Sequence, residues 1–188
     1  MRPKIVNILL VVAGVSALAI AGESSGVWLD VPFVKQEKNG CGAASIAMVM
    51  QFWQRQQGLA PTAVPDAPEI HLSLYSSKAH GIYASDLERY FEQHGYRAFA
   101  FEGRVQDLQD HLAKGRPLIV ALQPAAKTPL HYVVVAGFDP AKNVVLVNDP
   151  AERKLLQRDL STFKKEWKGA GNWTLLAVPQ AERASSQR

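Results

Sequence analysis

The chain contains a single cysteine, and the residues around it constrain the fold and the chemistry more than any other stretch. Cys41 lies between Gly40 and Gly42, where the polar run 36–40 gives way to a helical pattern. The residues that follow combine good helix formers with apolar side chains at helical spacing: Ala43, Ala44, Ile46, Ala47, Met48, Val49, Met50 and Trp53. The sequence therefore predicts a long helix over 42–57 with Cys41 at its N-terminus.

A helix N-terminus favours a negative charge, because its first backbone N–H groups are unpaired and the helix dipole places its positive end there. The thiolate is the nucleophilic form of cysteine. We therefore expect Cys41 to act as a nucleophile, with Gly40 and Gly42 leaving room for a substrate beside the sulfur. The alternative is that Cys41 is a small buried apolar residue, as free cysteines often are.

The N-terminal residues 1–24 have the pattern of a targeting segment. Arg2 and Lys4 precede an apolar run at 5–21, and its last three residues, Ala19-Ile20-Ala21, fit a small-x-small cleavage site. We predict a cleaved signal peptide at 1–21, and the alternative is an uncleaved membrane anchor, for which the run is short. The expected location is periplasmic or secreted, with membrane contact only if the segment stays attached.

Residues 22–180 are expected to form one domain, followed by a polar, disordered tail at 181–188. A lone cysteine allows no internal disulfide. The formal net charge of +4 is mild, and no basic run alternates with aromatic residues, which excludes a nucleic-acid-binding function. His71, His80 and His94 lack metal-ligand spacing, so we expect no metal or other cofactor. We expect a monomer.

The order of predicted elements indicates an α+β fold in which helices come first and an antiparallel sheet follows. In the helix at 84–94, Ser85 is the predicted N-cap and Glu88 fits a capping box. The region 59–80 is read as a surface excursion, because it contains three prolines and no sustained period. The remaining expected elements are strands at 27–34, 96–101, 118–122, 131–138, 144–147 and 173–178, and helices at 69–74, 105–114 and 161–168.

Two residues are candidates to assist the cysteine. His131 begins the most strand-like run of the chain, and Asp149 follows the next predicted strand. A turn is expected at 139–143. If it lies near 141–143, the two residues lie at the same open end of a hairpin, where side chains on adjacent strands can touch. A carboxylate can then fix the tautomer of the imidazole and leave its other nitrogen facing the thiol. Nucleophile, base and orienting carboxylate are the set that acyl transfer requires.

Gln36 is the candidate to stabilise a reaction intermediate. An attacked carbonyl needs hydrogen-bond donors aimed at its developing oxyanion, and the Gln36 side-chain amide and the Cys41 backbone N–H could supply two. Asn39 is the alternative donor, and Asn148 is the alternative orienting residue. Gln36 could also be a solvated loop residue, and Asp149 a turn residue before a proline.

Several short motifs together resemble a known family. Gln36 precedes Gly-Cys-Gly-Ala-Ala at 40–44, His-Tyr-Val-Val-Val follows at 131–135, and Asn-Asp-Pro stands at 148–150. The segment 81–95 adds to this likeness. In this order and spacing, the motifs resemble those of the bacteriocin-processing cysteine peptidases, papain-like enzymes known for cutting leader peptides after a double glycine. The resemblance covers about residues 28–178.

The resemblance implies a papain-like fold in which an N-terminal helical half, with the nucleophile at a helix N-terminus, packs on a C-terminal antiparallel sheet. It also implies the roles of nucleophile for Cys41, general base for His131, orienting residue for Asp149 and oxyanion donor for Gln36. The best-known members are fused to a membrane exporter with a cytoplasmic ATPase, whereas the N-terminus of this chain predicts a standalone exported form.

The leading hypothesis is an exported cysteine peptidase that hydrolyses peptide bonds in a peptide or protein substrate. One alternative is an amidase or transpeptidase that uses the same residues on cell-wall peptides. Another is a non-catalytic module that keeps the fold and binds peptides.

Overall fold

The computed structural model describes residues 26–59 and 65–180. The predicted signal peptide at 1–21 and the predicted tail at 181–188 lie outside the described residues. Within the two described ranges, no helix is both long enough and apolar enough to cross a membrane.

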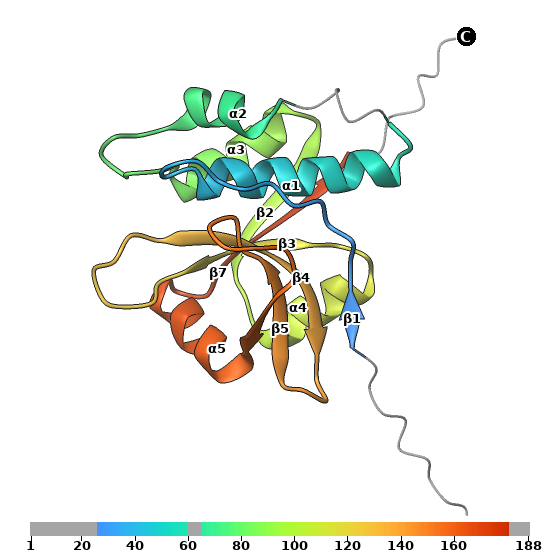
Figure 1. Cartoon of the computed structure of the whole chain (residues 1–188). Coiled ribbons are helices and arrows are strands. Elements are labelled where there is room, and N and C mark those ends of the chain that lie inside the picture. The colour runs from blue at the N-terminus through green and yellow to red at the C-terminus, as the bar shows by residue number, and fades with distance from the viewer. Residues whose placement is uncertain (1–25, 60–64, 181–188) are drawn as a thin grey trace, which may run out of the picture.

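A seven-stranded antiparallel sheet forms the centre of the molecule, as the α+β prediction requires (Figure 1). Six strands follow the order β2-β7-β3-β4-β5-β6, and β1 pairs with β4 beyond the end of β3. The strands are β1 (Val27–Trp28), β2 (Tyr96–Glu102), β3 (Leu118–Leu122), β4 (His131–Asp139), β5 (Val144–Asn148), β6 (Leu156–Asp159) and β7 (Trp173–Pro179).

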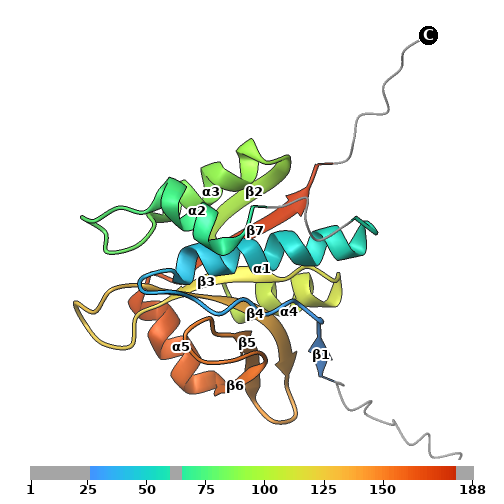
Figure 2. The ribbon, with the colours of Figure 1, turned by 45° about the horizontal axis from the view of Figure 1, so that its top comes forward.

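Helices cover both faces of this sheet (Figures 1 and 2). The described residues form α1 (Cys41–Gln56), α2 (Ala67–Leu74), α3 (Ala84–Gln93), α4 (Val105–Ala113) and α5 (Leu160–Gly169). One buried cluster joins α1, α2 and α3 to one face of β3, β4 and β7, and a second joins α4 and α5 to the other face. This two-sided packing explains why β3 is buried at every position and reads as an unbroken apolar run.

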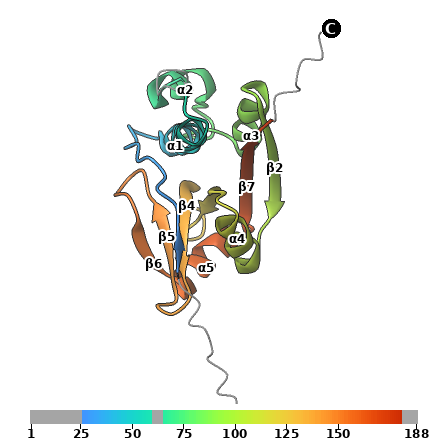
Figure 3. The same cartoon turned by 90° about the vertical axis from the view of Figure 1, so that its right-hand side faces the viewer.

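Helix α1 lies in the middle of the first cluster, with α2 on its side away from the sheet (Figure 3). Its residues from Gly42 to Met50 are all buried, which fits a helix with apolar side chains around most of its circumference. It ends where Gly58 adopts a φ of +68° and the Leu59 N–H returns to the Gln54 carbonyl at 3.0 Å. The predicted helix and its glycine stop are confirmed.

Two helices begin at aspartates that accept hydrogen bonds from the first turn. Asp66 forms a capping box with Glu69, so α2 begins two residues earlier than the predicted 69–74 helix. Asp159 accepts from the backbone N–H groups of Ser161 and Thr162 at the start of α5. The prediction missed both caps because each aspartate follows residues without a clear period.

The predicted cap of α3 is wrong. The residue before the helix is Tyr83, which makes no side-chain cap, and Ser85 already lies inside the first turn. Glu88 does not close a capping box, because its Oε1 atom accepts from the backbone N–H of Ala100 on β2 at 3.3 Å. Glu88 therefore links α3 to the neighbouring strand.

The N-terminal strand is shorter than predicted and β6 was not predicted at all. Only Val27 and Trp28 pair as a strand, and Leu29 adds one hydrogen bond to the Ala136 carbonyl at 2.7 Å. After that point the chain leaves β4, and the carbonyls of Val31 and Pro32 accept from the Asn148 side chain instead. We call residues 29–36 the strap, because this segment crosses from β1 to the loop before Cys41.

Candidate active site

Cys41 is the first residue of α1 and is partly exposed. The turn before it is tight: Asn39 has a φ of 59°, and the Gly40 N–H donates to the Glu37 carbonyl at 3.0 Å. As the first helical residue, Cys41 has a backbone N–H without an intrahelical acceptor. The predicted placement of the cysteine at a helix N-terminus is confirmed.

The two flanking glycines do not leave space for a substrate, as we had expected. A Cβ atom on Gly42 would lie 3.2 Å from the Ile82 Cβ atom, and one on Gly40 would lie 3.1 Å from the Glu37 carbonyl oxygen. Protein atoms therefore occupy both positions. The glycines allow the turn and the close approach of residue 82 to the helix tip.

The β4–β5 hairpin brings His131 and Asp149 together. The turn lies at 140–143, within the stretch predicted for it, and the Nε2 atom of His131 is 2.7 Å from the Oδ1 atom of Asp149. With Nε2 engaged in this way, Nδ1 is the ring nitrogen left for Cys41. Burial by itself would lower the pKa of His131, but hydrogen bonding to Asp149 and Cys41, together with their charges, raises that pKa to about 9.

Asp149 is buried with 1% of its surface exposed. Burial by itself would raise the pKa of its carboxyl group, but the hydrogen bond and charge of His131 outweigh this effect. The Ala151 N–H and the Arg158 charge act in the same direction, so the pKa lies below its ordinary value. The pair is therefore an imidazolium and a carboxylate at neutral pH, placed beside the sulfur.

Gln36 is held at the other side of the site by its backbone. Its N–H donates to the Pro150 carbonyl at 2.9 Å, so the end of the strap is tied to the residue after Asp149. The Gln36 Oε1 atom is buried without a hydrogen-bond partner among the described residues. The side chain is therefore not a fully solvated loop residue, the alternative considered above.

Asn148 does not contact His131 as the alternative orienting residue would. It is fully buried, and its Nδ2 atom donates to the carbonyls of Val31 (3.1 Å) and Pro32 (3.2 Å). Its Oδ1 atom accepts from the Leu155 N–H at 2.9 Å. Asn148 therefore fixes the strap and has no hydrogen bond to His131. Asn39, the alternative donor, lies in the turn before Gly40.

A cavity of about 340 Å³ opens beside Cys41. Its walls are mostly apolar and come from the loop before α3 and from the start of β4: Ala79, His80, Gly81, Ile82, Tyr83, Ala84, Leu130 and Tyr132. His80 is exposed at the edge of this cavity. A hollow of this size next to Cys41 can receive part of an extended peptide.

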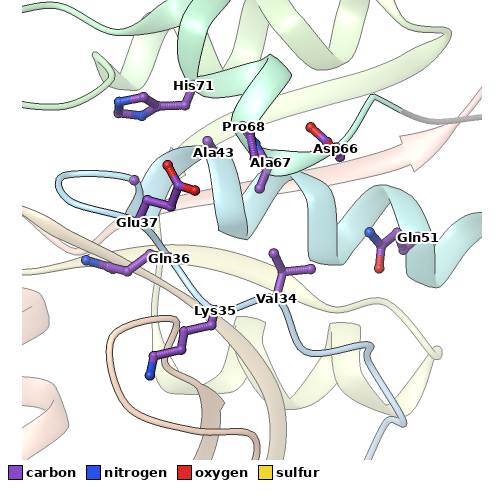
Figure 4. A pocket seen from close by; sticks show the side chains of 11 residues that line it. Val34, Lys35, Gln36, Glu37, Ala43, Gln51, Asp66, Ala67, Pro68 and His71 are labelled. Atoms are coloured by element: carbon purple, nitrogen blue, oxygen red, sulfur yellow. The ribbon is translucent and has the colours of Figure 1, made fainter.

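A second cavity, of about 170 Å³, lies between α1, α2 and the loop that contains Gln36 (Figure 4). The Glu37 carboxylate points toward α2 in this view, whereas the Lys35 ammonium points away from it. His71 also lines the cavity, from within α2 and with its Nδ1 atom buried. The loop that contains Gln36 therefore has a cavity on the side that faces α2.

Two residues near the site were missed by the sequence reasoning. Arg158 on β6 lies 3.5 Å from the Oδ2 atom of Asp149, and its other terminal nitrogen lies 2.5 Å from Glu166 on α5. The sequence of β6, Leu-Gln-Arg-Asp, has no apolar alternation that could have indicated a strand there. In the part of the chain that the structure describes, no cluster of His, Cys, Asp and Glu could hold a metal ion.

Comparisons with known proteins give a family match and two similar folds. A family model described as the Peptidase_C39 like family matches residues 28–175. The fold is similar to that of a double glycine motif protease from an AMS/PCAT transporter, solved with a leader peptide, at 22% identity and a TM-score of 0.64. That match covers 82% of this chain and 95% of the protease.

A second solved structure with a similar fold is the peptidase domain of Streptococcus ComA, a bi-functional ABC transporter of a quorum-sensing pathway. It is 20% identical with a TM-score of 0.61, over 80% of this chain and 98% of the domain. A search of curated proteins finds no match.

Proposed function

The chain belongs to the peptidase C39-like family and is a cysteine-type peptidase, and we propose that it cleaves peptide bonds with Cys41, His131, Asp149 and Gln36. The observation that carries this proposal is the 2.7 Å contact between His131 and Asp149 beside a cysteine at a helix N-terminus. These groups supply a nucleophile, a proton carrier and an orienting carboxylate.

In the first half of the reaction, the Cys41 thiolate attacks the carbonyl carbon of the scissile bond and forms a carbon–sulfur bond. The carbonyl oxygen becomes an oxyanion, which the Cys41 backbone N–H and the Gln36 side-chain amide stabilise. The His131 imidazolium then gives its Nδ1 proton to the leaving amine as the carbon–nitrogen bond breaks. The products of this half are a free amine, a thioester on Cys41 and a neutral imidazole.

In the second half, a water molecule attacks the thioester. His131 accepts one proton from that water, and the carbon–sulfur bond breaks to return the thiolate and release a carboxylic acid. Asp149 holds the ring in one orientation through both halves, because its carboxylate binds Nε2 and leaves Nδ1 free to carry the proton.

We propose a peptide substrate that runs through the cavity beside Cys41. The related protease solved with a leader peptide supports a peptide, and the apolar wall formed by Ile82, Tyr83 and Leu130 supports contact with apolar side chains. We also propose that the protein acts outside the cytoplasm, on the basis of the N-terminal residues 1–21. That it is a monomer stays a prediction. Cell fractionation of the full chain and of a variant without those residues tests the location. Retention of the full chain in the cytoplasm would contradict export.

The test of the activity is incubation with a peptide library that includes Gly-Gly leader-type peptides and cell-wall stem peptides, read by mass spectrometry. We expect hydrolysis by the wild type and none by Cys41→Ala or His131→Ala. The matched control is His94→Ala, because His94 is an exposed histidine on the turn after α3. Hydrolysis of a side-chain or terminal amide with release of ammonia would indicate the amidase, and exchange of one amino acid for another would indicate the transpeptidase. Binding without turnover would indicate the non-catalytic module.

A further inference from the structure

The carboxylate of Asp149 has a different set of partners on each oxygen. Its Oδ1 atom accepts from His131 Nε2 at 2.7 Å and from the Ala151 backbone N–H at 3.0 Å. Its Oδ2 atom lies 3.5 Å from the guanidinium of Arg158. Asp149 is only 1% exposed, so bulk solvent does not reach its carboxylate. Arg158 therefore engages the oxygen that His131 does not use.

Arg158 is in turn held from its other side. It projects from β6, and its Nη1 atom lies 2.5 Å from the Oε2 atom of Glu166 on α5. The two side chains are only 18% and 15% exposed. Helix α5 is itself held to the residue after β3, because the Glu166 carbonyl accepts a hydrogen bond from the Gln123 N–H at 2.9 Å. A continuous chain of contacts thus runs from α5 through β6 to the hairpin.

We propose that Arg158 and Glu166 are positioning residues of the active site, which fix the Asp149 carboxylate in the orientation that binds His131. The proposal rests on the proposed function, since it assigns Asp149 to the reaction. Neither residue is placed against the sulfur, and both act through Asp149. A guanidinium suits this task, because its planar fork can engage two carboxylates at once.

Removing Arg158 has two opposite consequences for His131. The loss of a nearby positive charge raises the pKa of an imidazole. The loss of the contact to Oδ2 also frees the buried carboxylate to turn away from Nε2, and a weaker hydrogen bond lowers that pKa. The other charged groups around the ring and the guanidinium are Cys41, Glu152, whose Oε1 lies 3.8 Å from Arg158, and Glu166. If Arg158 positions Asp149, the weaker hydrogen bond has the larger effect, and the pKa of His131 falls when Arg158 is removed.

The experiment is an NMR titration of the His131 ring, together with kcat and KM, in the wild type, Arg158→Met and Glu166→Gln. We expect an apparent pKa of about 9 in the wild type and a value lower by about one unit in Arg158→Met. We expect kcat to fall roughly tenfold or more with little change in KM, and Glu166→Gln to shift both quantities less in the same direction. The control is Arg97→Met, which removes the same charge from an exposed position on β2 and should change neither quantity.

An unchanged or raised pKa in a folded Arg158→Met protein, with unchanged kcat, would overturn the proposal. If Arg158→Met does not fold, Arg158→Lys and Glu166→Gln take its place. Lysine keeps the positive charge but lacks the planar guanidinium that can engage two carboxylates. Wild-type values of both quantities in these two variants would overturn the proposal equally. The proposed function has a separate test: it fails if the wild type cleaves no peptide. In that case the pKa values of His131 can still be compared between the variants.

Discussion

The backbone N–H of Gln36 donates a hydrogen bond to the Pro150 carbonyl at 2.9 Å. This contact joins the residue proposed to bind the oxyanion to the turn that carries the proposed orienting carboxylate. The residue before that carboxylate, Asn148, holds the strap at Val31 and Pro32. The segment 148–150 therefore positions both Gln36 and Asp149. We expect substitutions in this segment to disturb both residues.

Asn148→Ala should reduce both stability and activity. The substitution leaves the carbonyls of Val31 and Pro32 and the N–H of Leu155 without the partners they have in this buried region. We expect the free energy of unfolding to fall on the order of 2 kcal/mol, and kcat to fall because the strap no longer fixes Gln36. Urea denaturation and steady-state kinetics measure the two effects.

The control for that variant is Gln106→Ala. Gln106 also donates from a side-chain amide, to Asp110 at 2.8 Å, but on the exposed surface of α4. Its loss should change the free energy of unfolding by less than about 0.5 kcal/mol. Equal destabilisation of the two variants would show that Asn148 does not fasten the strap.

Gln36→Ala should lower kcat while leaving KM nearly unchanged. The amide is proposed to stabilise charge that develops only in the transition state, so its removal affects the chemical step more than substrate binding. Loss of one such donor typically lowers kcat by about 10²- to 10³-fold. Steady-state kinetics with a cleaved peptide measures this. A wild-type kcat in Gln36→Ala would remove Gln36 from the mechanism and leave Asn39 as the donor to test.

The ionisation of His131 should make stability fall as the solution becomes alkaline. The pKa of the ring is about 9 in the folded chain and is ordinarily 6.5. A raised pKa means that the charged ring stabilises the fold, fully below pH 6.5 and with a loss as pH rises through about 9. The ionisation of the Asp149 carboxyl affects stability in the opposite direction. Because its pKa is lowered in the folded chain, the carboxylate stabilises the fold at pH values above its ordinary pKa, and this stabilisation is lost as the pH falls.

This dependence is measured by denaturation of the wild type and His131→Gln at about pH 6, 8 and 10. The difference in unfolding free energy between the two proteins should be largest at the lowest of these values and smallest at the highest. A difference that is constant or grows with pH would contradict the raised pKa. Peptide cleavage should decline above about pH 9 for the same reason, because the proton donor is then lost.

Elements with strong local signals were predictable from the sequence. Helix α1 has apolar residues at helical spacing and a glycine stop, and β4 is an unbroken apolar run that starts at His131. The hairpin that joins β4 to β5 required only a short turn near the predicted place. That hairpin brings His131 and Asp149 to the same end of the two strands, although the strand pairing itself stops at Val134 and Asn148. Their catalytic roles stay predictions.

Features that depend on distant contacts were not predictable. The apolar alternation of 27–34 indicated a strand, but after Leu29 the backbone binds the Asn148 side chain, which no local pattern reveals. The four-residue strand β6 is too short for its period to stand out, so Arg158 went unnoticed. The space around Gly42 was misjudged for the same reason, because Ile82 comes from a loop forty residues further along the chain.

The pairing of Cys41 with His131 is tested most directly by the rate at which iodoacetamide alkylates Cys41 near pH 6, measured by intact mass. Most free thiols are protonated and slow to react at that pH. We expect the wild type to react at least about tenfold faster than His131→Ala, because the imidazolium stabilises the thiolate, with the gap closing near pH 9. Equal rates in the two proteins, or no labelling of the native wild type, would contradict the pairing.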